Sequence, residues 1–295
     1  MKKVLILLST YNGEKFLKEQ YNSLISQTGV DAHVLTRDDG SSDNTLELLK
    51  SLGAEDIIEG KNAGACGSFL ELIKIAPLEY DYYAFCDQDD LWDSDKLSCA
   101  AEQLDKMSSD KPALYYCGQL ITDGDLNPIY EHRMDKRRSR FSNCVFNQMS
   151  GCTAVFNKAL LIKLKKDMPK DIFGHDTWTY RVCAALDGDI FVDEDTHIKY
   201  RQHGNNVVGL TNGFKSKIQR AKKYIFEFNS ESYAKEILRI YPDELSEKNR
   251  AFFQDVSDAN TSSSARKRLL NDYDINFNNR MLNIIFKIKV HLKKM

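Results

Sequence analysis

Short apolar runs alternate with amphipathic stretches and polar turns over roughly the first 100 residues of the chain. Each run has about five residues, which is the length of a buried strand and too short for an independent helix. Strand, turn and helix repeated in this way predict an α/β fold with a parallel sheet and helical crossovers. The expected strands are residues 4–8, 33–36, 57–59 and 82–86, and the expected helices are residues 16–27, 45–52 and 69–75.

The second half of the chain is less regular. Its pattern predicts strands at 113–117, 151–157, 190–192 and 197–201, with helices at 158–166 and 177–185. From about residue 214 only helices are expected, with a loop at 261–264. Because 295 residues exceed one typical domain, we expect a catalytic domain at 1–212, with halves 1–110 and 111–212, and a helical region at 213–295.

Polar segments follow three of the expected strands, at residues 9–14, 37–44 and 87–90. The carboxyl ends of parallel strands meet at one edge of a sheet, where open α/β sheets bind their ligands. Asp87 and Asp89 fall on one side of an extended backbone, so both carboxylates can reach one Mg²⁺ or Mn²⁺ ion. Such acidic clusters also serve as turns or helix caps, which is the competing interpretation.

Five polar motifs, taken in order, resemble glycosyltransferase family 2 on the GT-A fold. They are STYNGE at 9–14, RDDGSSD at 37–43, NAG at 62–64, DQDDLW at 87–92 and HD at 175–176. The resemblance covers about residues 1–205. Within the family, the segment YRQHGNNVVG at 200–209 is most similar to bacterial rhamnosyltransferases.

This resemblance implies a mostly parallel central sheet flanked by helices, with a C-terminal helical extension. It also implies an inverting transferase that moves a sugar from a nucleoside diphosphate to a hydroxyl group. The donor would be dTDP-L-rhamnose, with a UDP-sugar as the alternative. The acceptor would be a glycan or lipid-linked sugar in cell-surface polysaccharide synthesis, and the cofactor Mn²⁺ or Mg²⁺.

Matching motif positions also assigns roles to single residues. Asp176 would be the general base, Asp89 would bind the metal, and Asp87 would approach the ribose or the metal. The nucleotide-sugar would contact Ser9, Thr10, Tyr11, Asn12, Glu14, Asp39, Asn62, Gly64, Ser68, Asp87 and Gln88. These roles fit the chemistry: a metal offsets charge on the departing diphosphate, and a carboxylate deprotonates the acceptor hydroxyl.

Several of these positions have a structural alternative. Asp176 can instead cap the helix that is expected from Thr177. His203 can bind the metal, donate to a phosphate, or satisfy a local hydrogen bond. Residues 62–68 can bind the donor at a helix start or form an ordinary loop. The basic segment 133–140 can grip acceptor phosphates or simply be solvated.

Large aromatic residues near the expected site also have two interpretations. Trp92, Trp178 and Tyr180 can stack on sugar rings, although aromatic side chains close to strand ends are commonly core residues.

Charge and hydropathy single out the C-terminal region. The formal net charge is −2, but residues 213–295 carry 17 Lys and Arg against 10 Asp and Glu. One face of the last expected helix contains Met281, Ile285, Ile288, Leu292 and Met295, and Arg280, Lys287 and Lys294 recur on another face. Such a helix can lie on an anionic membrane surface or pack on its own domain or a second subunit.

These features predict a cytoplasmic protein, peripheral at the inner face of the cell membrane and possibly homodimeric, since no run approaches 18 apolar residues. We expect no nucleic-acid partner. Seven cysteines without a C-x-x-C pair fit a reducing compartment.

Other enzyme classes fit the motifs less well. A sugar nucleotidylyltransferase needs a Gly-rich basic loop after the first strand, and an aspartyl phosphatase needs Thr or Val shortly after its second aspartate. Neither feature is present, and the dinucleotide-binding and P-loop glycine motifs are also absent. A catalytically silent nucleotide-sugar-binding module stays open, because a sequence does not show turnover.

Overall fold

The computed structural model describes residues 1–203 and 229–295 of the chain. Three predictions therefore lie outside the described residues: the boundary at 212, the start of the helical region at 214, and the 204–209 part of the rhamnosyltransferase-like segment. All structural statements below concern the described ranges.

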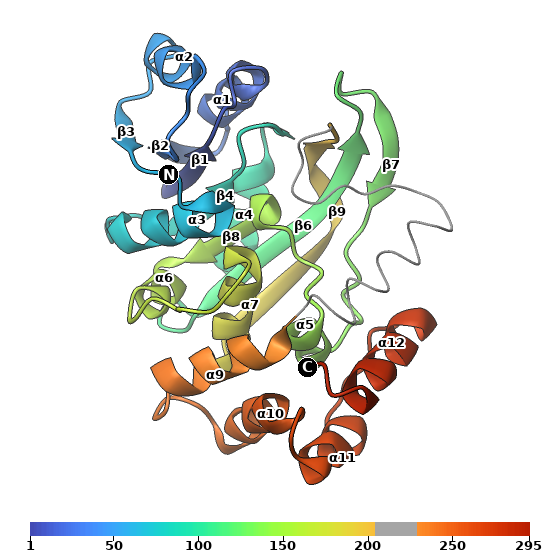
Figure 1. Ribbon diagram of the computed structural model, residues 1–295. Coiled ribbons are helices and arrows are strands. Elements are labelled where there is room, and N and C mark those ends of the chain that lie inside the picture. Colours follow the sequence, from blue (N-terminus) through green and yellow to red (C-terminus); the bar gives the residue numbers. More distant parts are fainter. Residues whose placement is uncertain (204–228) are drawn as a thin grey trace.

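The N-terminal half forms the parallel sheet that the apolar runs predict (Figure 1). Its strands are β1 (Lys2–Thr10), β2 (Val30–Asp38), β3 (Asp56–Glu59) and β4 (Tyr82–Cys86), in the spatial order β3-β2-β1-β4. The crossovers are α1 (Leu17–Ile25), α2 (Thr45–Ser51) and α3 (Gly64–Ile75), and α4 (Lys96–Leu104) follows β4. Every residue of β4 is buried, so this strand lies in the centre of the molecule.

The second half adds antiparallel pairs, so the complete sheet is mixed. Its strands are β5 (Leu91–Trp92), β6 (Ala113–Thr122), β7 (Pro128–His132), β8 (Ala154–Asn157) and β9 (Asp189–Arg201). Strand β8 runs antiparallel to both β4 and β6, and β9 runs parallel to β6 but antiparallel to β5. The two strands expected at 190–192 and 197–201 are a single strand, β9, whose register with β6 shifts twice.

Two helices begin earlier than the sequence pattern predicts. Helix α3 starts at Gly64 rather than residue 69, because the Asp39 carboxylate accepts a hydrogen bond from Ala63 N–H and holds the chain there. Helix α7 (His175–Ala185) starts two residues before Thr177, with Gly174 as its N-cap. A short 3₁₀ turn, η1 (Gly151–Thr153), replaces the start of the strand expected at 151–157.

Four capped helices end the chain. They are α9 (Ser230–Ile240), α10 (Glu247–Asp258), α11 (Ser263–Asn271) and α12 (Arg280–His291), and the smaller helices α5 (Arg140–Val145) and α6 (Lys158–Leu164) precede α7. The N-cap side chains of the four are Asn229, Ser246, Ser262 and Asn279. No described helix is both long enough and apolar enough to cross a bilayer.

The alternation of side chains along β1 divides the core into two layers. Leu5 and Leu7 belong to one hydrophobic cluster, whereas Val4, Ile6 and Leu8 belong to another on the opposite face of the sheet. Helices α1 and α4 cover the second cluster, and α3, α6 and α7 cover the first.

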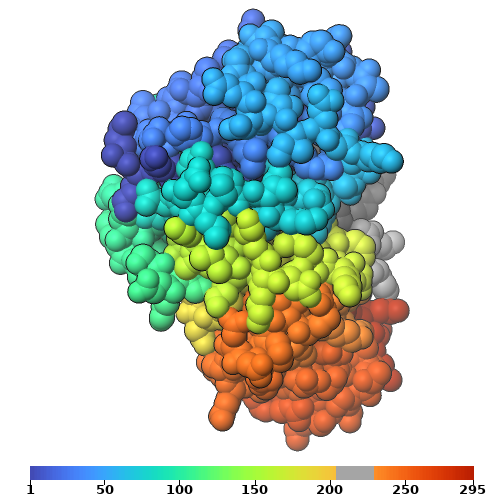
Figure 2. Space-filling view, turned by 90° about the vertical axis from the view of Figure 1, so that its left-hand side faces the viewer, coloured from blue at the N-terminus to red at the C-terminus, as the bar shows by residue number. Residues whose placement is uncertain are grey.

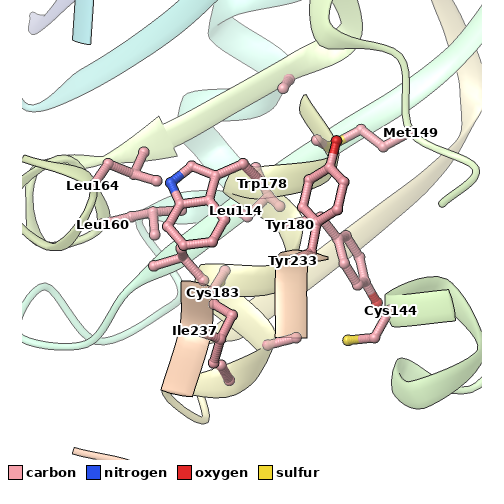
Figure 3. Packing of buried hydrophobic residues seen from close by; sticks show 14 of the residues in the cluster. Leu114, Cys144, Met149, Leu160, Leu164, Trp178, Tyr180, Cys183, Tyr233 and Ile237 are labelled. Atoms are coloured by element: carbon pink, nitrogen blue, oxygen red, sulfur yellow. The ribbon is translucent and has the colours of Figure 1, made fainter. Parts of the chain in front are cut away.

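The C-terminal helices extend the first cluster. Trp178 and Tyr180 of α7 lie among side chains of α6, β6 and α9, including Ile237 and Tyr233 (Figure 3). In Figure 2 the blue segment at the start of the chain and the orange C-terminal helices occupy opposite ends of the molecule. Trp92, Trp178 and Tyr180 are at most 3% exposed, so they are core residues and do not stack on sugars.

Candidate active site

Three polar turns meet at one edge of the sheet, as the strand pattern predicts. In register, Thr10 at the end of β1 lies beside Asp38 of β2, and Leu8 lies beside Cys86 of β4. The segments 9–14, 37–44 and 87–90 therefore leave the sheet side by side. This edge contains most of the predicted donor-binding residues.

Gln88 holds the turn after β1. Its amide accepts a hydrogen bond from Tyr11 N–H at 2.8 Å and donates to the Tyr11 carbonyl at 2.9 Å. A Cβ atom on Gly13 would lie 2.1 Å from Gln88 Oε1, so any larger residue there would displace this amide from its contacts with Tyr11. Gln88 thus fixes the backbone of Tyr11. The Tyr11 residue is 46% exposed at this edge of the sheet, where its ring can stack on a planar ligand.

Other predicted donor-binding side chains connect the neighbouring loops to one another. The hydrogen bonds run from Ser9 Oγ to Ser68 Oγ at 2.7 Å, from Thr10 Oγ1 to Asp38 Oδ2 at 3.0 Å, from Ser42 N to Asn12 Oδ1 at 2.8 Å, from Asn44 N to Glu14 Oε2 at 3.0 Å, and from Gly64 N to Asn62 Oδ1 at 3.1 Å. These contacts shape the rim of the site, and contact with a nucleotide stays a prediction for each of these residues.

Asp39 is 2% exposed and forms an ion pair with Arg37, which is also buried. Ala63 N–H donates to both carboxylate oxygens of Asp39, at 2.9 and 3.0 Å. Arg37 also donates to Ser68 Oγ at 2.9 Å, which joins α3 to the end of β2. Arg37 was not predicted as a site residue, although an arginine directly before two aspartates at a buried strand end was the available signal.

The three carboxylates of the acidic turn after β4 have different neighbours. The backbone bends at Gln88 and Asp89, so the extended geometry expected for Asp87 and Asp89 is wrong. Asp89 Oδ2 lies 2.8 Å from His203 Nε2, whereas the ligand atoms of Asp87, Asp90 and Cys152 lie within 4.8 Å of one another. Burial and the charges of Asp89 and Asp176 raise the pKa of Asp87 to about 7.

The Asp89 and His203 pair fits a divalent cation better than the buried group around Cys152. Both side chains of the pair are partly exposed, at 19% and 15%, and offer the oxygen and nitrogen donors that Mn²⁺ accepts. Asp90 and Cys152 are almost completely buried, and burial raises the pKa of the Cys152 thiol well above its usual value. A protonated, enclosed thiol is a poor metal ligand.

Asp176 lies in the first turn of α7, whose N-cap is Gly174, so its expected place as the N-cap residue is wrong. Its carboxylate still accepts from a first-turn amide, the Thr177 N–H. Burial raises the pKa of Asp176, although the Thr177 N–H donates to its carboxylate. Its charge in turn raises the pKa values of Asp87 and of Cys66 near the start of α3. The predicted base and the acidic turn are therefore close enough to interact electrostatically.

His175 secures the start of α7. Its ring stacks on Phe69 of α3 with centroids 3.9 Å apart and meets Phe85 of β4 edge-on at 4.8 Å. Burial lowers the pKa of His175 to about 3, so the imidazole is neutral. These contacts attach the helix that contains Asp176 to the strand that leads into Asp87.

Four of the five cations in the basic segment 133–140 pair with nearby carboxylates, and Arg138 donates to the Phe146 carbonyl. Its ion pairs are Arg133 with Glu131, Lys136 with Glu194, Arg137 with Asp135 and Arg140 with Asp187. These contacts favour the structural interpretation of the segment over phosphate binding.

Similar proteins identify the family of this chain. The glycosyl transferase family 2 model matches residues 5–165. A dTDP-rhamnosyl transferase of Shigella flexneri, RfbG, is 34% identical over 234 residues, which cover 72% of this chain and 77% of that protein.

Two solved structures share the fold. TarS 1–349 of S. aureus in complex with UDP-GlcNAc has a TM-score of 0.58 at 17% identity, over 96% of this chain and 78% of that one. The mannosyltransferase PcManGT of Pyrobaculum calidifontis, in complex with GDP-Man and Mn²⁺, has a TM-score of 0.57 at 15% identity, over 99% and 87%. Because the family model matches more than half of the chain and a 34% identical relative is covered over 77% of its length, the chain belongs to glycosyl transferase family 2.

Proposed function

We propose that this glycosyltransferase transfers L-rhamnose from dTDP-L-rhamnose, with inversion, to a hydroxyl of a glycan or lipid-linked acceptor in cell-surface polysaccharide synthesis. The observation that carries the proposal is the ring contact of His175 with Phe85, at 4.8 Å between centroids. It holds the base candidate Asp176, the neighbour of His175, against the strand that leads into Asp87 and Asp89. The donor assignment is supported by the 34% identity to a protein named as a dTDP-rhamnosyl transferase.

Asp89 and His203 would hold the divalent cation, with Asp87 close by. When bound, the cation would offset the negative charge that develops on the leaving diphosphate. Tyr11 would stack on the base, and Asp39 would accept from the pyrimidine N–H.

Asp176 would accept the proton of the acceptor hydroxyl. The acceptor oxygen forms a bond to the anomeric carbon, while the bond from that carbon to the phosphate oxygen breaks and its electron pair leaves with the diphosphate. Attack on the face opposite the leaving group inverts the anomeric configuration. The raised pKa of Asp176 makes it a stronger base than an exposed aspartate, which helps it to take a hydroxyl proton.

Thermal unfolding of the full chain tests the donor. The protein is titrated with dTDP, UDP, GDP and their sugars, with Mn²⁺, with Mg²⁺, and with EDTA. A ligand that binds the native state raises Tm by mass action, so a selective and metal-dependent rise identifies the base and the cofactor together. A larger rise with a UDP-sugar would change the proposed donor only. No rise with any nucleotide or nucleotide-sugar would contradict nucleotide-sugar binding at this site.

The surface of α12 supports placing the enzyme on the inner face of the membrane. Met281, Ile284, Ile288 and Leu292 are each at least 40% exposed, and the exposed basic residues Arg280, Lys287 and Lys294 accompany them. The prediction of one apolar face is wrong for Ile285 and Met295, because both side chains are buried in the core. A basic helix with an exposed apolar stripe fits an anionic lipid surface, and a second subunit is the competing partner.

A further inference from the structure

The last residue of β9, Arg201, lies behind the Asp89 and His203 pair and is 3% exposed. Its side chain joins three segments that are distant in sequence. Nε donates to the carbonyl of Asp89 at 2.9 Å, Nη1 donates to the carbonyl of Gly124 at 2.8 Å, and Nη2 pairs with Glu19 of α1. The backbone N–H of Arg201 also donates to Asp90 Oδ1 at 3.2 Å.

Arg201 reaches His203 by a second route. Its guanidinium lies 4.6 Å from the ring centroid of Phe16, and that ring lies 4.7 Å from the ring of His203. Arg201 therefore contacts Asp89 directly and is linked to His203 through the ring of Phe16. Nε of Arg201 binds the main-chain oxygen of Asp89 and not its side chain. The Asp89 carboxylate is therefore still able to contact His203.

We infer that Arg201 is a positioning residue that holds Asp89 and His203 in the arrangement that binds the cation. Planar guanidinium groups suit this task because they donate in several fixed directions at once. Outer groups that orient metal ligands typically change metal affinity by about 10-fold to 100-fold when removed. The inference rests on the metal site of the proposed function.

Mn²⁺ binding to the full chain, followed by the loss of the free-ion electron paramagnetic resonance signal, tests the inference without any turnover. Arg201→Met should weaken Mn²⁺ binding by about 10-fold. Arg201→Lys keeps the charge but cannot reach all three acceptors, so a loss is expected there too. If Arg201 acted only through its charge, Arg201→Met would bind Mn²⁺ more tightly, and this result or an unchanged affinity would overturn the inference.

Arg239→Met is the matched control. Arg239 lies in α9 and pairs with Asp167 and Glu236. Its replacement by Met should leave the Mn²⁺ affinity unchanged. If Arg201→Met does not fold by circular dichroism, Arg201→Lys decides the question by the same titration. Absence of Mn²⁺ binding by the wild type would remove the metal site itself and the inference with it, whereas binding that survives in both Arg201 variants would remove the inference alone.

Discussion

At the scale of single residues, Asp176 is partly buried and lies in the first turn of a helix that His175 attaches to the sheet. The contacts explain why its carboxylate has a fixed position. Its N-cap alternative fails on the same observation, because the helix has already begun at His175. Asp176→Asn keeps an oxygen that can accept from Thr177 N–H, so the base assignment can be tested without losing this contact.

Asp176→Asn should reduce kcat by roughly 100-fold to 10,000-fold, the usual range for loss of a general base. Donor binding should persist, because the amide preserves the shape of the side chain. The measurements are release of nucleoside diphosphate in the presence of a bacterial lipid extract, and the Tm rise with the preferred donor.

The control for this substitution is Asp171→Asn, an exposed carboxylate shortly before α7. It should retain wild-type turnover. Wild-type kcat in Asp176→Asn would withdraw the role of base from Asp176.

Asp87 provides a prediction about pH and stability. Burial and neighbouring carboxylates raise its pKa to about 7, so folding favours its protonated form. The stabilising contribution of that proton is present below the ordinary aspartate pKa and is lost as pH rises through about 7. Asp87→Asn, which is neutral at every pH, should therefore raise Tm at pH 8 by at least about 2 °C.

The measurement is thermal unfolding of wild type and variant in EDTA at pH 4 and pH 8. The difference between the two proteins should be smaller at pH 4, where the wild-type carboxyl is protonated. A lower Tm of Asp87→Asn at pH 8 would show that the carboxylate charge stabilises the fold. Nucleotide titration of the same variant reports separately on any loss of binding.

Sequence motifs singled out Asp39, Asp89 and Asp176 as candidate site residues. They did not single out the two arginines that contact Asp39 and Asp89. Arg37 and Arg201 lie at the ends of strands, where a single sequence gives no sign of which distant carbonyl or carboxylate a guanidinium will meet. Their partners, such as Asp39 and Glu19, become neighbours only when the strands assemble. Tertiary contacts of this kind lie beyond pattern analysis.

At the scale of elements, the buried strand β4 was predicted better than the start of α3. A run of five apolar residues marks β4 completely, because burial on both faces needs no alternation. The early start of α3 depends instead on a hydrogen bond from Ala63 to Asp39 across the sheet edge. The continuity of β9 through its polar middle depends on pairing with β6.

Asn157 allows a test of a side chain that joins separate elements. Its Oδ1 caps α6 by accepting from Leu160 N–H and also accepts from Ala113 N–H, and its Nδ2 donates to the Lys111 carbonyl. Asn157→Ala leaves these buried groups unpaired, so the free energy of unfolding should fall by about 2 to 4 kcal/mol. Urea unfolding measures this change.

The matched control is Ser246→Ala at the N-cap of α10. Ser246 Oγ accepts from Asn249 N–H, and its removal should cost only about 1 kcal/mol. Equal losses in the two variants would mean that Asn157 acts as a helix cap alone and does not join β6 to β8.

At the scale of the whole molecule, the C-terminal helices complete one core layer and present a separate surface. Ile285, Phe286 and Val290 of α12 are buried in the cluster that also contains Trp178. Removing the helix would therefore damage the fold as well as the exposed stripe. Substitution of exposed residues separates the two effects.

Ile284→Glu combined with Ile288→Glu should weaken binding to vesicles that contain phosphatidylglycerol by at least about 10-fold. Both side chains are exposed, at 48% and 40%, so the fold should tolerate the change. The two carboxylates remove apolar contact with the lipid and repel the anionic surface, so both contributions to binding fall. Cosedimentation with vesicles measures the bound fraction.

The distinction between a lipid partner and a second subunit comes from two further measurements. Neutral phosphatidylcholine vesicles should bind the wild type more weakly, and added salt should weaken binding to the anionic vesicles, because charge attraction between exposed groups is screened. Exposed Ile162→Glu on α6, far along the chain from α12, is the control that should bind as the wild type does. If the double variant instead keeps its vesicle binding and changes from dimer to monomer in size-exclusion chromatography, the stripe is a subunit interface.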